Sequence, residues 1–375
     1  FLTVKLYDTL RDHTPVALFP REIDYTEWQT LRRYPILNWN MGMTYRLRER
    51  DERVYPQGEL ARRTIGQVGD KGNYGVEYVL RDVLEGRDGK ARRQRIARGF
   101  YGRVVGGDNS EPEDGLDVVT TLDLEMQDVA DRALRRQLEA QNALWGTALV
   151  MEVATGDLLA MANLSRTKSG AYAEVKNHAL SSRMEPGSTF KLAALLALVD
   201  DAGMSLDETF DTGNGARVKV GRTTVQDSHG LPPLNLKDAV AHSSNVFFAR
   251  AVYETYKDDP ERYVDYLRHL HLDRTVGLEE FGAVAPIFPA PGMKIWYPDV
   301  SIVNMGYGYA IELTPLHTLT LYNAVANDGC MVAPRLVREI RRGGEVVERP
   351  ERRVLVDKIC SSSALRKVRE CLEEV

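Results

Sequence analysis

One segment constrains the fold more than any other: a serine and a lysine three residues apart stand directly before a run of apolar residues. Ser188 and Lys191 precede the apolar run 192–199, and a Pro-Gly pair precedes the serine. Proline and glycine suit a sharp turn into a helix, and a helix that is apolar on nearly all sides must be buried. The run is far shorter than the ~20 residues that cross a bilayer. The sequence therefore predicts a buried helix over Phe190–Asp200, with Ser188 in its first turn.

The same serine and lysine form a candidate catalytic pair. A serine hydroxyl is a poor nucleophile until a nearby base takes its proton, and residues three apart share one face of a helix. Burial and the positive end of the helix dipole both favour the uncharged amine of Lys191, which can act as that base. Ser165 and Lys168 have the same spacing, but they lie in a polar loop with no apolar run behind them. We predict Ser188 as the nucleophile and Lys191 as the base; the alternative is a surface pair spaced by chance.

A second polar patch lies among apolar residues at Ala241–Phe248. Buried polar side chains without partners cost about 1 to 3 kcal/mol each, so these side chains need a role. We predict that Ser243 relays a proton between the lysine and the leaving group. We also predict that the Asn245 amide holds the lysine and a substrate carbonyl. The alternative is that Ser243 or Ser244 only caps a helix.

The chain of 375 residues is long enough for two or three domains, and its character changes near residue 117. Short alternating segments and glycine-rich turns predict an irregular, β-rich domain over residues 1–116. A strand, a helix and a hairpin then predict an antiparallel sheet with helices packed on it over residues 117–375, which is an α+β fold. The elements expected in this second domain are strands over 118–122, 146–153 and 158–162 and helices over 123–140, 190–200, 236–256, 260–270 and 315–327. A last helix is expected to carry the stripe Leu365, Val368, Cys371 and Leu372 and to be capped by Ser361 or Ser362.

Composition excludes several classes of function. Lys and Arg total 49 against 54 Asp and Glu, so no global positive field attracts nucleic acid. The three cysteines include no Cys-x-x-Cys, and the seven histidines include no His-Glu-x-x-His, so we expect reduced thiols, no metal and no cofactor. The turn at 213–221 lacks the strand-to-helix setting of a nucleotide loop, and the absence of a Gly-x-Ser-x-Gly motif argues against an α/β-hydrolase.

Ser188-x-x-Lys191 followed by Ser243-x-Asn245 resembles the signature of penicillin-binding proteins and serine β-lactamases. Further segments resemble class B penicillin-binding proteins: 115–123, 153–162, 306–316 and 326–334 their transpeptidase domain, and 55–66 their N-terminal pedestal. The resemblance implies a transpeptidase domain with an antiparallel sheet and helices on both faces, preceded by an irregular, β-rich pedestal.

The family's third motif, Lys-Thr/Ser-Gly, does not follow Asn245. The triplet Lys168-Ser169-Gly170 precedes the nucleophile, so we predict that it is a loop. In the family the third motif supplies a cation for the substrate carboxylate and lies beside a donor of the oxyanion hole. We expect the natural protein to continue past Val375 with that motif and to begin before Phe1 with a membrane anchor.

The resemblance further implies the activity of a peptidoglycan D,D-transpeptidase of the division type. Stem peptides would be its substrates and β-lactams would acylate Ser188. A membrane glycosyltransferase and other division proteins would be its partners. A single-pass anchor would hold it in the inner membrane, with the catalytic domain in the periplasm. Three alternatives stay open: an elongation-type transpeptidase, a β-lactamase or D,D-carboxypeptidase, and a non-catalytic scaffold of the division machinery.

Overall fold

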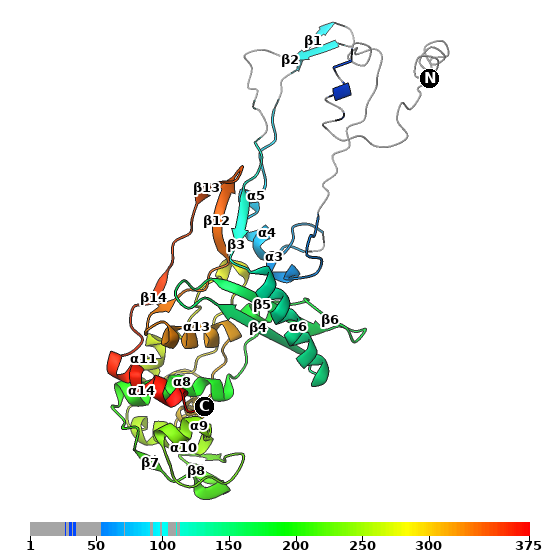
Figure 1. Ribbon diagram of the computed structural model, residues 1–375. Coiled ribbons are helices and arrows are strands. Elements are labelled where there is room, and N and C mark those ends of the chain that lie inside the picture. The colour runs from blue at the N-terminus through cyan, green and yellow to red at the C-terminus, as the bar shows by residue number, and fades with distance from the viewer. Residues whose placement is uncertain are drawn as a thin grey trace. The chain divides into compact units, whose positions relative to one another are not determined.

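The computed structural model describes residues 54–70, 72–90, 110 and 113–375, the main chain of 93–97 and 100–103, and five positions between 27 and 34. Contacts divide the chain into residues 1–56 and residues 57–375, and the second unit holds the elements described below (Figure 1). The β-rich domain expected over 1–116 lies largely outside the described residues. Its character and its boundary with the second domain stay predictions.

Three short helices lie in the part of this unit that precedes the sheets. They are α3 (Arg62–Ile65), α4 (Gly75–Val79) and α5 (Arg81–Leu84), and they are followed by the antiparallel pair β1 (Arg93–Ala97) and β2 (Phe100–Arg103). The main-chain N–H of Arg63 donates a hydrogen bond of 2.8 Å to the carboxylate of Glu174. Glu174 also accepts from the main-chain N–H of Asn163, in the central sheet. One carboxylate therefore joins α3 to that sheet.

The central sheet is antiparallel and has helices on both faces. Its strands run in the order β4 (Trp145–Met151), β5 (Leu158–Arg166) and β6 (Tyr172–Ala173). Ala160 and Ala162 of β5 pack against Ala130 of helix α6 (Leu124–Ala140). Met161, which points to the opposite face, packs with α7 (His178–Ser181) and α13 (Pro315–Ala326). The predicted sheet with helices on both faces is confirmed.

A second sheet forms between distant parts of the chain. It runs in the order β13 (Glu345–Glu348), β12 (Val337–Arg342) and β3 (Asp117–Thr120), all antiparallel (Figure 1). Smaller pairs join β11 (Met331–Val332) to β14 (Val354–Val356), β7 (Thr209–Phe210) to β10 (Leu234–Asn235), and β8 (Val218–Val220) to β9 (Thr223–Val225).

Two predicted helix starts are confirmed by the caps that the structure shows. The Asp123 side chain accepts from the main-chain N–H of Met126 and begins α6. The Ser361 side chain accepts from the N–H of Ala364 and begins α14 (Ser362–Leu372), in which Cys371 is buried. Both caps satisfy N–H groups that lack partners inside the helix.

The predicted buried helix is confirmed and has three parts. A 3₁₀ turn, η1 (Gly187–Phe190), leads into α8 (Lys191–Leu196), which widens into the π-helix η2 (Ala197–Asp201). Ser188 thus lies in the 3₁₀ turn just before the α-helix. Residues 192–199 are buried in the largest apolar core, which also receives α10 (Asn245–Tyr256), α11 (Pro260–His269) and α12 (Ser301–Gly306).

The prediction of one continuous helix over 236–256 is wrong. Helix α9 ends at Ala241 after beginning at Leu236, and α10 begins at Asn245. Ser243 has a φ of 51°, a left-handed conformation that no α-helix contains. Ser244 then caps α10 by accepting from the N–H of Phe247. The polar residues 242–245 interrupt the apolar pattern at this point, and the prediction of a single helix did not take that interruption into account.

The remaining short helices are η3 (Gly213–Gly215) and η4 (Glu279–Phe281). Across the described ranges, every helix is either too short or too polar to cross a lipid bilayer.

Candidate active site

The turn that carries Ser188 is held by a close main-chain contact. The N–H of Gly187 donates to the carbonyl of Gly308 at 2.9 Å. A Cβ atom added to Gly308 would lie 1.8 Å from the carbonyl oxygen of Gly187, and Gly308 has a φ of +95°. Both facts require glycine at position 308. Ser188 itself is exposed, so its hydroxyl is open to a substrate from solvent.

The side chain of Lys191 is buried, and its amine contacts four oxygen atoms. The Nζ atom lies 3.1 Å from Ser188 Oγ, 2.6 Å from the Ser243 carbonyl oxygen, 3.0 Å from Ser243 Oγ and 2.8 Å from Asn245 Oδ1. The carbonyl and amide oxygens can only accept, so they take two N–H groups of the amine. An uncharged amine has two N–H groups and one lone pair. Its lone pair is therefore left for a hydroxyl, that of Ser188 or that of Ser243.

Burial lowers the pKa of Lys191 from its ordinary value of 10.5 to about 8, and the negative charge of Asp227 opposes this shift. A pKa near 8 leaves roughly a tenth of the amines uncharged at pH 7, against less than a thousandth for an ordinary lysine. Burial thus increases the uncharged fraction of this amine at neutral pH.

Ser243 and Ser244, which are adjacent in this segment, have different contacts. Ser244 is fully buried and caps α10, as the structural alternative supposed. Ser243 is exposed, and its left-handed backbone turns both its carbonyl and its hydroxyl toward Lys191. The structure therefore brings all four predicted site residues, Ser188, Lys191, Ser243 and Asn245, into one cluster around a single amine.

The rival serine and lysine do not form such a cluster. Ser165 lies in β5 and its Oγ hydrogen-bonds with His178 Nε2 at 2.7 Å. Lys168 lies in the turn between β5 and β6, as predicted for the triplet Lys168-Ser169-Gly170. Within the described part of the chain, no hydrogen bond joins Ser165 to Lys168. The spacing alone thus does not produce the contact; the turn into a buried helix does.

A family model described as the penicillin binding protein transpeptidase domain matches residues 146–375, which include the whole cluster. The chain belongs to this family of transpeptidase domains. Penicillin-binding protein PbpB of Mycobacterium tuberculosis is 29% identical over 343 residues, which cover 87% of this chain and 48% of that protein. The probable peptidoglycan D,D-transpeptidase PenA of Neisseria meningitidis is 27% identical over 292 residues, 75% of this chain and 48% of that protein. The chain thus spans about half the length of these relatives.

Solved structures agree with this family assignment. The crystal structure of penicillin-binding protein 3 from Mycobacterium tuberculosis, complexed with aztreonam, superposes with a TM-score of 0.69 and 27% identity. The match covers 85% of this chain and 68% of that one. A peptidoglycan synthetase from Bifidobacterium adolescentis, at 21% identity, has the same fold with a TM-score of 0.71 over 86% of this chain and 59% of that one.

Asp227 is a residue of the transpeptidase site that the sequence analysis missed. It is only 6% exposed, and its carboxylate accepts three hydrogen bonds from the start of α10. It lies in an irregular loop, 18 residues before Asn245, where no periodicity or motif marks it. An isolated acidic residue inside a loop carries no signal that separates it from a solvated one.

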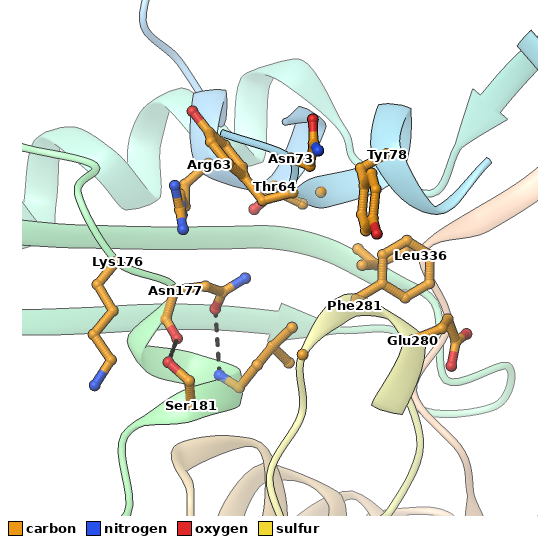
Figure 2. Close-up of a pocket in the computed structure, with 14 residues that line it drawn as sticks. Arg63, Thr64, Asn73, Tyr78, Lys176, Asn177, Ser181, Glu280, Phe281 and Leu336 are labelled. Carbon is orange, nitrogen blue, oxygen red and sulfur yellow. Dashed lines mark hydrogen bonds between the residues drawn. The ribbon is translucent and has the colours of Figure 1, made fainter. Parts of the chain in front are cut away.

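A cavity of about 280 Å³ lies elsewhere in the unit, between the α3–α4 segment and the transpeptidase domain. Figure 2 shows its lining: Arg63, Thr64, Asn73 and Tyr78 lie on one side. Facing them are Lys176, the α7 cap Asn177, Ser181 of α7, and Glu280 and Phe281 of η4. None of the four clustered residues lines it. In the described ranges, no group of three or more His, Cys, Asp or Glu side chains is placed to hold a metal ion.

Proposed function

We propose that this chain is the catalytic part of a peptidoglycan D,D-transpeptidase that works through an acyl-enzyme on Ser188. The single observation that carries the proposal is the 3.1 Å contact between the Ser188 hydroxyl and the buried amine of Lys191. Two acceptors that cannot donate occupy that amine's N–H groups. Its lone pair is then directed at a hydroxyl before any substrate binds, which removes a reorientation step from catalysis.

In the proposed acylation step, Lys191 takes the Ser188 proton while Ser188 Oγ attacks the carbonyl carbon between the two terminal D-alanines of a stem peptide. The C–N bond then breaks, and the departing D-alanine amine receives a proton. Ser243 Oγ lies 3.0 Å from Lys191 Nζ and relays this proton from the lysine. Asn245 accepts from the lysine through Oδ1 and donates to a substrate carbonyl through Nδ2.

In the second step, an amine from a neighbouring stem peptide attacks the ester carbonyl. The acyl group passes to that amine, the amine's proton returns through Ser243 and Lys191, and Ser188 Oγ is released as a hydroxyl. One peptide bond is broken and one is formed, so no oxidant, metal or nucleotide is consumed. A β-lactam acylates the same Ser188, because its strained amide imitates the donor peptide bond.

We further propose that the protein acts in the periplasm in septum synthesis, anchored in the inner membrane. Its partners are then a membrane glycosyltransferase and other division proteins. The support is the match to Caulobacter vibrioides FtsI, named a probable peptidoglycan D,D-transpeptidase, at 26% identity over 336 residues, 88% of this chain and 50% of that protein. An elongation-type role is the alternative; depletion of the protein in its host separates the two, since a division role yields filaments and an elongation role yields rounded cells.

The decisive experiment measures the intact mass of the full-length protein after incubation with a penicillin. We expect one covalent adduct in the native protein and in Ser165→Ala, and none in Ser188→Ala. Ser165→Ala is the matched control because Ser165 and Lys168 repeat the spacing without the contact. An adduct that persists in Ser188→Ala moves the nucleophile elsewhere.

The lifetime of the adduct separates the remaining alternatives. An ester that lasts for hours indicates a transpeptidase, whereas one lost within seconds indicates a β-lactamase. Release of D-alanine without cross-linked product indicates a D,D-carboxypeptidase. A native protein that forms no adduct with any penicillin is the result expected of a non-catalytic scaffold.

A further inference from the structure

Asp227 has an unusual set of partners for a buried carboxylate. Its Oδ2 accepts from the Ser244 hydroxyl at 2.8 Å, and its Oδ1 accepts from the main-chain N–H groups of Asn245 at 2.5 Å and Val246 at 3.2 Å. All three donors belong to the cap and first turn of α10. A carboxylate in this position also interacts favourably with the positive end of the helix dipole.

The residues that Asp227 holds are directly linked to the atoms that hold Lys191. Three of the four oxygens around the lysine amine come from Ser243 and Asn245, the neighbours of Ser244 on either side. On the other side of the junction, carbonyls of α9 accept from the N–H groups of Ser243 and Ser244. The left-handed conformation of Ser243 is costly for a residue with a side chain, so it persists only where its surroundings fix it.

We propose that Asp227 is a positioning residue of this active site, which fixes the α9–α10 junction so that Ser243 and Asn245 orient the amine of Lys191. The inference rests on the proposed function, because it concerns the same base. Asp227 touches neither substrate nor reacting atom; it acts through Ser244 and Asn245. Its role is also electrostatic, because its negative charge stabilises the lysine cation.

In the described part of the chain, Asp227 is the charged group that shifts the pKa of Lys191. Burial lowers the pKa of Lys191, and the charge of Asp227 is the opposing influence. The other titratable groups near the site are Glu185, before the nucleophile turn, His242, at the end of α9, and His229, after Asp227. None of these three shifts the pKa of the lysine. Neutralising Asp227 must therefore lower that pKa further.

The test is the pH profile of penicillin acylation for two variants of the full-length protein. Asp227→Asn keeps the shape and loses the charge, so we expect the midpoint of the profile to move to lower pH. Asp227→Ala loses both, and we expect the plateau rate to fall on the order of 100-fold, the usual cost of misplacing a catalytic group by an ångström. A merely structural residue lowers the yield of folded protein but does not move the midpoint.

Asp200→Asn is the matched control. Asp200 also holds the start of a helix through a capping serine, since its Oδ1 accepts from the N–H and hydroxyl of Ser361. It has no influence on Lys191. We expect the pH profile of acylation for Asp200→Asn to have the same midpoint as that of the native protein. Its plateau rate should lie within about twofold of the native rate.

The outcomes separate the inference from the proposed function. If the native protein is acylated at Ser188 while Asp227→Asn has an unchanged midpoint and the rate of Asp200→Asn, the inference is overturned and the function stands. If the native protein is not acylated at all, both fail. If Asp227→Ala does not fold, the midpoint of Asp227→Asn decides, and near-ultraviolet circular dichroism verifies that this variant is native.

Discussion

The amine nitrogen of Lys191 lies 2.6 Å from the main-chain oxygen of Ser243, closer than to any other oxygen that it contacts. The lysine is thus oriented chiefly by the junction between α9 and α10, and only secondarily by the nucleophile. Because a main-chain carbonyl cannot be removed by substitution, this orientation depends on the backbone conformation at Ser243.

Replacing Lys191 with arginine tests whether the amine acts as a base. Arginine keeps a positive charge but stays protonated throughout the accessible pH range, so it cannot accept the Ser188 proton. We expect the rate of penicillin acylation to fall about 100- to 10,000-fold, the usual contribution of a general base. Lys168→Arg is the control and should retain the native rate. Equal rates in the two variants contradict the assignment.

The native pH profile provides a second test. The pKa of Lys191 is lowered to about 8, and the uncharged amine is the active form. The second-order rate constant for acylation should therefore rise by roughly tenfold per pH unit well below the midpoint and level off above it. Stopped-flow measurements with a fluorescent penicillin between pH 6 and 9.5 give this profile. A rate that is flat or falls across this range excludes Lys191 as the base.

Asn245→Asp should raise the midpoint of the pH profile of acylation, whereas Asp227→Asn should lower it. The new carboxylate would stand where an amide oxygen now lies 2.8 Å from the lysine amine, and an opposite charge at that distance raises a lysine pKa. We expect the midpoint to shift to higher pH and the rate at pH 7 to drop about tenfold or more. Asn177→Asp, a similar exchange at the cap of α7, should leave the midpoint unchanged.

Gly308→Ala tests the contact that holds the nucleophile turn. The added Cβ would collide with the carbonyl oxygen of Gly187, so the turn that presents Ser188 must shift. We expect a loss of acylation on the order of 100-fold. Gly282→Ala is the matched control, because Gly282 has a φ of +93° and an added Cβ atom there would meet no other atom within 4 Å. If both variants lose the same activity, backbone strain and not the collision is responsible.

Glu174 should make stability depend on pH. Burial raises the pKa of Glu174 from 4.5 to about 7. Below pH 4.5 the carboxyl is protonated in both the folded and the unfolded state, and above pH 7 it is ionised in both, so the cost of burying the charge appears between these values. We expect the free energy of unfolding, relative to Glu174→Gln, to fall by up to about 3 kcal/mol across that window.

Urea unfolding of both proteins at pH 5 and pH 8 measures this difference. Glu174→Gln cannot ionise, and it leaves one of the two N–H groups of Arg63 and Asn163 without an acceptor. That lost hydrogen bond costs the same at both pH values, so the change of the difference with pH isolates the charge. A difference between the two proteins that is the same at both pH values contradicts the prediction.

Much of the transpeptidase domain could be predicted because local signals agree with tertiary packing. Asp123 and Ser361 stand directly before amphipathic runs, and each caps the predicted helix. The apolar run 192–199 is rich in leucine and alanine, which favour a buried helix over a buried strand. The break at 242–244 had a local signal, because four successive polar residues, His242 to Asn245, interrupt the apolar pattern and include the serine that caps α10. The left-handed φ of Ser243 had no such signal.

The candidate site could likewise be predicted only in part. Ser188 and Lys191 are three residues apart, so helical geometry alone places them together. Ser243 and Asn245 could be named from their motif, but their contact with the lysine joins segments more than 50 residues apart. Asp227 could not be found, because only the folded chain reveals that its carboxylate faces the start of α10.

The link between α3 and the central sheet uses the main-chain N–H of Arg63 and the side chain of Glu174. Every residue except proline has such an N–H group, whereas few side chains offer two acceptors in the right place. This link therefore requires a particular side chain at position 174, whereas at position 63 it requires only a residue other than proline.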